Sequence, residues 1–270
     1  VMGFIEVAFG FKFLRVADQA YNWHLLDREI YLAIWIVVFA LLGLYLLGKI
    51  RFAHDDEPVE KLGVGRFTLA VIVLSFVVYR IPGMFGAPLK GLSGYLPPLQ
   101  SQDFVLGANT VAAGPAVSGN VGSSKYSHLE LPLGLHGDFT LDEGLAESKR
   151  TGKHVFVDMT GHGCTNCREM ESRVWSAPEV LRILNEDYVI VALYTDDKSE
   201  LLPEDYVTDE QSGKVYTQMG RAFSYIARTR FGSNAQPTYA ILAENGKLLV
   251  PVRGYHLDVE DFVRFLQSGL

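Results

Sequence analysis

The sequence contains only two cysteines, and they lie three positions apart, at Cys164 and Cys167. There is no second Cys-x-x-Cys and no histidine pair at ligand spacing, so the four ligands of a structural zinc site are not available. The chain also lacks a basic stripe, and its formal net charge is −7, which gives no reason to expect nucleic-acid binding. These absences direct attention to thiol chemistry and to the apolar part of the chain.

Charge is missing altogether from the run between Ile30 and Gly48, which is close to the roughly 20 residues that cross a bilayer as a helix. A buried helix of a soluble core is the alternative, but such a helix is rarely apolar on every face. A second run, Phe67 to Tyr79, is short enough for a core helix, but it is flanked by Arg66 and Arg80, whose side chains can reach the membrane surface. We predict a partial transmembrane domain over residues 1–100, with spans at about 30–50 and 64–84.

The opening residues 1–14 lack the charged start and the cleavage site of a signal peptide, and we interpret them as the end of a truncated helix. Basic residues gather between the two predicted spans, at Lys49, Arg51, Lys61 and Arg66. The positive-inside tendency therefore favours a cytoplasmic loop there and places everything after residue 90 on the outer side, where disulfide chemistry is permitted.

Residues 107–127 are rich in Gly, Ala and Ser and almost uncharged, which is typical of a flexible tether. We predict a linker over 101–135 and a soluble domain over 136–270. Within that domain the patterns alternate between strand and helix and end in a hairpin and a closing helix. Thr140 with Glu143 predicts one helix start, Asn245-Gly246 predicts the hairpin turn, and Asp258 predicts the last cap. Residues 196–214 break the alternation and are interpreted as a surface insertion.

The two cysteines follow a predicted strand, 154–160, and open a helix, an arrangement typical of redox-active pairs. The spacing allows a disulfide, and a helix N-terminus stabilises a thiolate on the first cysteine. Cys164 is therefore expected to attack and Cys167 to resolve. The alternatives are half of a zinc site, a purely structural disulfide, or buried apolar thiols. We expect no metal and no cofactor other than the redox-active disulfide.

The stretch "VFVDMTGHGCTNC", with "NAQPT" about 70 residues later, resembles the active site of a thioredoxin fold. It is closer still to the carboxy-terminal domain of the DsbD family of membrane thiol:disulfide interchange proteins, whose last membrane helices the first hundred residues also resemble. The resemblance implies an α/β thioredoxin-like domain, a mixed sheet flanked by helices, tethered to an α-helical transmembrane segment. It implies roles for Asp158, for Glu171, and for Pro237 as a cis proline.

The resemblance further implies a protein-disulfide reductase of the bacterial inner membrane, multi-pass, with its thioredoxin-like domain in the periplasm and a link to cytochrome c biogenesis. Its partners would be an upstream membrane cysteine pair, which this chain does not contain, oxidised periplasmic thiol proteins, and membrane lipid. Asp158 would accept a proton beneath the sulfurs, although a strand-end aspartate facing solvent is the alternative. Glu171 lies on the helical face of Cys167, and a solvated surface charge is its alternative.

Two departures from the thioredoxin pattern concern the surface around the cysteines. Residues 161–163 read "GHG", where thioredoxins carry tryptophan before the first cysteine, and the intervening pair is Thr165-Asn166. His162 could support a thiolate, although a loop histidine is more often only exposed. An oxidase or isomerase on the same fold, or a redox-inert binding module or membrane anchor, are the competing functions.

Overall fold

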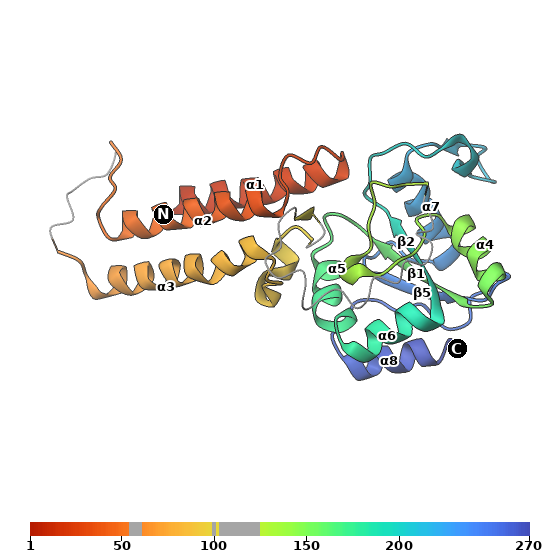
Figure 1. Cartoon of the computed structure of the whole chain (residues 1–270). Helices are drawn as coiled ribbons and strands as arrows, with labels where there is room; N and C mark the ends of the chain where they lie inside the picture. Colours follow the sequence, from red (N-terminus) through yellow and green to blue (C-terminus); the bar gives the residue numbers. More distant parts are fainter. Residues whose placement is uncertain (54–60, 99–100, 103–124) are drawn as a thin grey trace. The chain divides into compact units, whose positions relative to one another are not determined.

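The computed structural model describes residues 1–53, 61–98, 101–102 and 125–270. The chain divides into two compact units, which are described separately (Figure 1). One unit comprises Val1–Ala17 and His24–Gly107, and the other comprises Asp18–Trp23 and Ala108–Leu270. Most of the predicted tether, residues 103–124, lies outside the described residues.

The first unit is helical. Its elements are α1 (Met2–Ala20), α2 (Arg28–Leu46), α3 (Val64–Arg80), η1 (Ile81–Phe85) and η2 (Lys90–Tyr95). Helices α2 and α3 pack closely at Gly43, where a Cβ atom would meet the side chain of Leu74 at 2.5 Å. A larger residue at position 43 would require the Leu74 side chain to shift, so the small glycine favours the close packing of the two helices.

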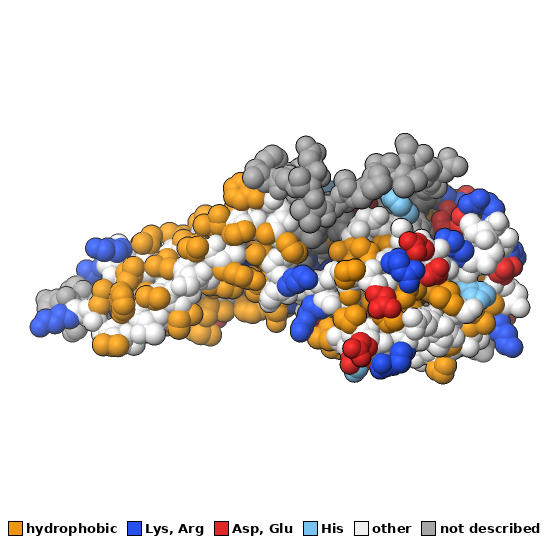
Figure 2. All heavy atoms as spheres, turned by 60° about the horizontal axis from the view of Figure 1, so that its bottom comes forward, with side chains coloured by type: hydrophobic (Ala, Val, Ile, Leu, Met, Phe, Trp, Pro, Cys, Tyr) orange, Lys and Arg blue, Asp and Glu red, His pale blue; other side chains and the backbone are white. Residues whose placement is uncertain are grey.

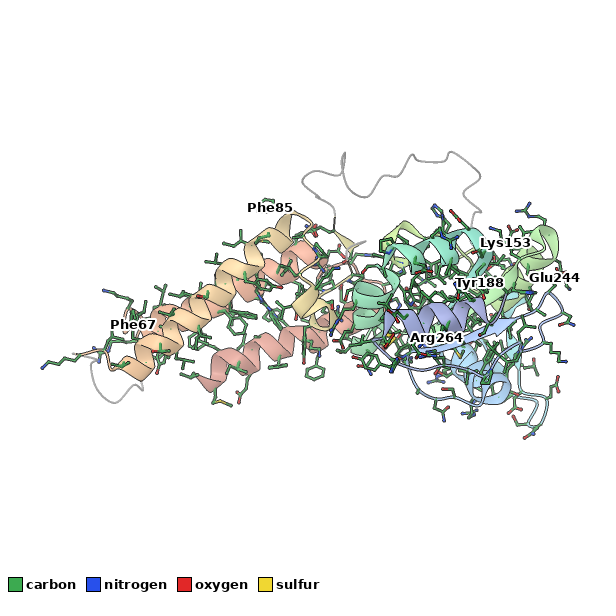
Figure 3. The ribbon with its side chains drawn as sticks, turned by 90° about the horizontal axis from the view of Figure 1, so that it is seen from below. Phe67, Phe85, Lys153, Tyr188, Glu244 and Arg264 are labelled. Atoms are coloured by element: carbon green, nitrogen blue, oxygen red, sulfur yellow. A yellow bond between two sulfur atoms is a disulfide. The ribbon has the colours of Figure 1, made fainter. Side chains whose placement is uncertain are left out.

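Two helices of the first unit are long and apolar enough to cross a membrane, judged by length and composition: Arg28–Leu46 and Val64–Phe85. Hydrophobic side chains cover most of the visible face of this unit, at the left of Figure 2. Phe67 and Phe85, near the two ends of the second helix, are 53% and 46% exposed and point away from the ribbon (Figure 3).

The second unit is built on a mixed sheet flanked by helices. Its helices and strands are α4 (Leu141–Thr151), β1 (His154–Thr160), α5 (Thr165–Met170), η5 (Glu171–Trp175), α6 (Pro178–Asp187), β2 (Tyr188–Tyr194), β3 (Val207–Thr208), β4 (Val215–Tyr216), α7 (Met219–Phe231), β5 (Thr238–Leu242) and α8 (Val259–Gln267). In the described residues the main sheet has the order β2-β1-β5, with β1 parallel to β2 and antiparallel to β5.

The two faces of β1 have different partners because successive side chains alternate. Phe156 packs against Trp175, Tyr239 and Phe262 in an aromatic core, with ring centroids 5.5 to 6.3 Å apart. Asp158 is two residues further on and therefore shares that face with Phe156. Tyr188 joins the sheet to α8 by donating a hydrogen bond to the Leu266 carbonyl at 2.5 Å.

Both predicted caps are confirmed. Thr140 accepts a hydrogen bond from the Glu143 N–H and donates one from its hydroxyl to the Glu143 carboxylate, so Thr140 caps the start of α4. Asp258 accepts a hydrogen bond from the Asp261 N–H at the start of α8. These local patterns need no tertiary context, which is why the sequence alone reveals them.

The predicted hairpin is present. The segment after the turn pairs antiparallel with β5, through bridges between Tyr239 and Arg253 and between Leu242 and Leu248. Gly246 has φ +79° and its N–H bonds to the Ala243 carbonyl. The turn therefore contains Asn245-Gly246, as predicted, and is a three-residue loop that ends in a left-handed glycine.

The prediction of a linker extending to residue 135 is wrong for its last part. Tyr126, Leu129, Leu131 and Leu135 are buried in the core of the second unit. Tyr126 also donates to the Asp205 carboxylate at 2.8 Å and accepts from the Leu202 N–H at 3.0 Å. The composition of small residues ends before this point, and apolar side chains spaced two or more apart attach the segment to the domain.

Candidate active site

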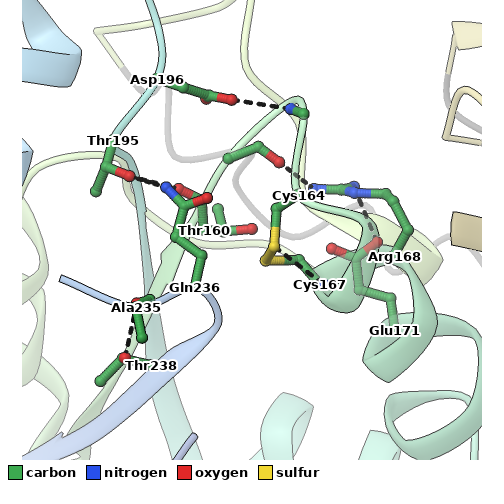
Figure 4. The surroundings of a disulfide bond; sticks show 12 residues. Thr160, Cys164, Cys167, Arg168, Glu171, Thr195, Asp196, Ala235, Gln236 and Thr238 are labelled. Carbon is green, nitrogen blue, oxygen red and sulfur yellow. Dashed lines mark hydrogen bonds and ion pairs between the residues drawn. A yellow bond between two sulfur atoms is a disulfide. The ribbon is translucent and has the colours of Figure 1, made fainter. Parts of the chain in front are cut away.

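The two cysteines lie where β1 ends and α5 begins. Cys164 is the N-cap of α5 and forms a disulfide with Cys167, with the two Cα atoms 5.3 Å apart (Figure 4). The Cys164 sulfur also accepts a hydrogen bond from the Cys167 N–H at 3.1 Å. The first cysteine therefore lies at the positive end of the helix, where a thiolate is favoured over a thiol.

The two sulfurs differ in access. Cys167 is 1% exposed, whereas Cys164 is partly exposed and lines an open hollow of about 330 Å³. The other lining residues are Thr165, Asn166, Asn234 and Gln236. A partner can therefore reach Cys164 and is kept away from Cys167, which is the asymmetry that attack and resolution need.

The peptide bond between Gln236 and Pro237 is cis, as the resemblance implied. It lies immediately before β5, which begins at Thr238. Gln236 lines the same hollow as Cys164, and its amide hydrogen-bonds to the Thr195 hydroxyl (Figure 4). The structure thus brings the proline loop beside the disulfide, although about 70 residues separate them in the sequence.

Asp158 is 3% exposed, so it does not face solvent. In the described part of the chain its Oδ1 atom has no hydrogen-bond partner. Burial raises the pKa of Asp158 well above its usual value, the nearby Glu171 adds to the rise, and Arg168 opposes it. A buried carboxyl with a raised pKa beside a redox-active pair is typical of a functional site, where such a group can take part in proton transfer.

Glu171 is also buried, at 7% exposure, and the alternative of a solvated surface charge is wrong. Its carboxylate lies 2.9 Å from Nη1 of Arg168, which is itself 7% exposed. Burial raises the pKa of Glu171 to about 7, against the opposing effect of Arg168. The two acids near the disulfide therefore differ in their surroundings, because Glu171 has a cationic partner, Arg168, at contact distance.

Sequence reasoning missed Asp196 and Asp197, which it interpreted as the start of a surface insertion. The Asp196 carboxylate accepts hydrogen bonds from the His162 and Gly163 N–H groups, each at 2.8 Å. Asp197 is 0% exposed and lies 2.8 Å from Nε2 of His162. The signal that could have found them is their position directly after β2, at the sheet edge where the cysteine loop also begins.

His162 is placed by this aspartate rather than left on the surface. Its ring stacks on Tyr194, with centroids 4.6 Å apart. Burial opposes ionisation of Asp197, but the hydrogen bonds from His162 and Ser199 outweigh it and hold the Asp197 pKa below its usual value. His162 is therefore fixed in the site by its contacts with Asp197 and Tyr194.

A thioredoxin-like fold with an accessible Cys-x-x-Cys disulfide at a helix start defines the class of protein: a thiol:disulfide oxidoreductase. Residues 141–269 match the family model of the thioredoxin-like domain. Two solved structures are similar to part of the chain. One, described as DsbH oxidoreductase, is 16% identical with a TM-score of 0.38 and covers 53% of this chain and 90% of its own. The other, a thioredoxin from Thermus thermophilus, is 22% identical with a TM-score of 0.35 and covers 48% of this chain and 83% of its own. The chain has no match among curated proteins.

Proposed function

We propose that this chain is a membrane-anchored protein-disulfide reductase of the DsbD type, which passes electrons through Cys164 and Cys167 to oxidised proteins outside the cytoplasm. The observation that carries the proposal is the asymmetry of the disulfide, with Cys164 open to a hollow and Cys167 1% exposed. A purely structural disulfide has no need of a hollow beside one sulfur.

In the reducing direction the chain begins as a dithiol. The Cys164 thiolate attacks a partner disulfide, forms a mixed disulfide and releases one partner thiolate, which takes up a proton. Cys167 then loses its proton and attacks the Cys164 sulfur, which releases the second partner thiol. Two electrons have passed to the partner, and the chain is left with the disulfide seen in the structure. A donor dithiol, in this proposal the upstream membrane cysteine pair, restores the starting state.

The buried acids favour reductase over oxidase. An oxidase of this fold is strongly oxidising because its reduced form, with a stabilised thiolate, is the favoured one. Here the buried Asp158 carboxyl lies close enough to Arg168 and Glu171, which follow Cys167 in the chain, for their charges to shift its pKa, and a negative charge at Asp158 would oppose a thiolate. The reduced form is then less stabilised, and the pair is a better electron donor.

The membrane anchor rests on the two apolar helices of the first unit. Only 33% of the apolar stretch in Arg28–Leu46 and 17% of that in Val64–Phe85 is buried in the described chain. A soluble core helix would bury its apolar side chains, whereas these present them outward, as lipid-facing helices do. With the basic residues of the intervening loop in the cytoplasm, the thioredoxin-like domain would lie in the periplasm.

The test uses the full chain in detergent. After reduction with dithiothreitol and removal of the reagent, it is mixed with insulin, whose disulfides serve as the probe. We expect about one insulin disulfide reduced per chain, no reduction by Cys164→Ser, and a reduction potential nearer the −270 mV of thioredoxins than the about −120 mV of strong oxidants. A potential near −120 mV would favour the oxidase, and no exchange with insulin or glutathione would favour a redox-inert binding module.

A further inference from the structure

The turn that precedes the attacking cysteine forms hydrogen bonds with two consecutive aspartates, Asp196 and Asp197, from the loop after β2. Residues 161–164 form a turn closed by the hydrogen bond from the Cys164 N–H to the Gly161 carbonyl at 3.2 Å. Two of the three residues before Cys164 are glycines, which have the widest backbone freedom of all residues. This turn has little means of fixing its own conformation.

Asp196 supplies the missing constraint. One carboxylate oxygen accepts the His162 N–H and the other accepts the Gly163 N–H, each at 2.8 Å. Both central N–H groups of the turn are therefore bound to a single charged acceptor, and such charge-assisted hydrogen bonds are about twice as strong as neutral ones. The short distance between turn and aspartate depends on Gly161, where a Cβ would lie 2.9 Å from the Asp196 carboxylate and 2.8 Å from Gln236 Oε1.

Asp197 holds the side chain at the corner of the same turn. Its Oδ2 lies 2.8 Å from His162 Nε2, and its Oδ1 accepts the Ser199 N–H at 2.7 Å. His128 Nε2 lies 3.8 Å from the same Oδ2 atom. The Tyr194 ring stacks on the face of the imidazole. Asp196 thus fixes the backbone of the turn, and Asp197 fixes its His162 side chain.

We propose that Asp196 and Asp197 are positioning residues for thiol:disulfide exchange, which hold the Gly161-His162-Gly163 turn so that Cys164 keeps its place over Cys167 in the reduced protein. This inference rests on the proposed redox function. In the disulfide state the S–S bond itself fixes the two sulfurs, so the aspartates matter most for the dithiol. Holding two thiols in place raises their effective concentration toward each other, which favours the disulfide.

The experiment measures the equilibrium of the full chain with reduced and oxidised glutathione, in detergent, for Asp196→Ala, Asp196→Asn, His162→Gln and His162→Leu. We expect the constant for disulfide formation to fall about tenfold in Asp196→Ala, because two charge-assisted hydrogen bonds are lost. Asp196→Asn keeps one acceptor oxygen, so its constant for disulfide formation should lie between those of Asp196→Ala and the wild type. His162→Gln keeps a side-chain donor toward Asp197, so its constant for disulfide formation should be larger than that of His162→Leu.

The matched control is Asp187→Asn, at the partly exposed end of α6, which should leave the constant unchanged. A substitution that only lowers overall stability does not alter this constant in molecules that remain folded, so the readout separates positioning from stability. If Asp196→Ala does not fold, Asp196→Asn decides, since it preserves size and shape. An Asp196→Asn variant with the wild-type constant, or Gln and Leu at position 162 with equal constants, would overturn the inference. A wild-type chain that does not exchange with glutathione at all would instead contradict the proposed function.

Discussion

The Arg168 guanidinium lies 2.9 Å from the carboxylate of Glu171, which follows the buried cysteine by one helical turn, and both residues are only 7% exposed. The same arginine reaches the Gly161 carbonyl, with Nη2 at 3.4 Å. Arg168 therefore connects the turn before Cys164 with the acid after Cys167, and its charge acts on both acids near the disulfide but is in direct contact with Glu171. This pairing changes what is expected when each acid is removed.

The attacking and resolving roles can be separated by trapping. Cys167→Ser should accumulate mixed disulfides with outer-compartment proteins, and Cys164→Ser should give about tenfold fewer, because the sulfur left in the second variant is buried. Non-reducing gels of cells that express each variant measure the yield. Equal yields from the two variants, or none from either, would contradict the assignment.

The two acids should shift the Cys164 titration unequally. In the reduced protein, Asp158→Asn should lower the pKa of Cys164 by about one unit, because a buried carboxylate that opposes the thiolate is removed. Glu171→Gln should lower it less, because Arg168 already offsets that charge. The measurement is the alkylation rate of Cys164 against pH. The apparent pKa belongs to the coupled groups, the thiol and the nearby acid, rather than to Cys164 alone.

The matched control for this titration is Glu169→Gln, on the same helix, where the carboxylate bonds to Tyr255 and Arg173 at the surface. The pKa of Cys164 should be unchanged in this variant. If neither acid variant moves the titration, or if both raise the pKa, Asp158 is a structural carboxyl without influence on the thiol.

Stability should depend on pH through Glu171. Its pKa is raised from 4.5 to about 7 in the folded protein, so the folded state holds this proton more tightly than the unfolded state. That contribution is fully present below pH 4.5 and is lost as the pH rises toward about 7, at up to about 1.4 kcal/mol per pH unit. The thermal midpoint of the oxidised chain should therefore fall across this window relative to Glu171→Gln. Parallel curves for the two proteins would show that the Glu171 pKa is not raised.

Topology can be tested with protease on intact spheroplasts. Cleavage within residues 103–124, where the sequence is rich in small residues, should release a soluble fragment that begins before Tyr126. The fragment should not be trimmed further, because Tyr126 and Leu129 are buried in the domain core. Protection of the fragment until the membrane is broken would place the domain in the cytoplasm.

Several features could be predicted from the sequence because their causes are local. The caps at Thr140 and Asp258 follow from hydrogen bonds to residues three positions away, and the apolar helices follow from continuous runs. The cysteine spacing alone indicates a redox pair at a helix start. The same locality explains the error at the linker end, because a short apolar segment shows its burial only when the core that receives it is known.

Tertiary structure decided which side chains surround the disulfide. Strands β1 and β2 are parallel and in register, so Thr160 lies opposite Tyr194, and the loops that follow the two strands leave the sheet side by side. That pairing brings Asp196 and Asp197 onto the turn before Cys164, although more than 30 residues separate them along the chain. The sequence shows two acids after a strand and two glycines before a cysteine. Only the register of the sheet makes them neighbours, because strand pairing depends on the whole core and not on any local pattern.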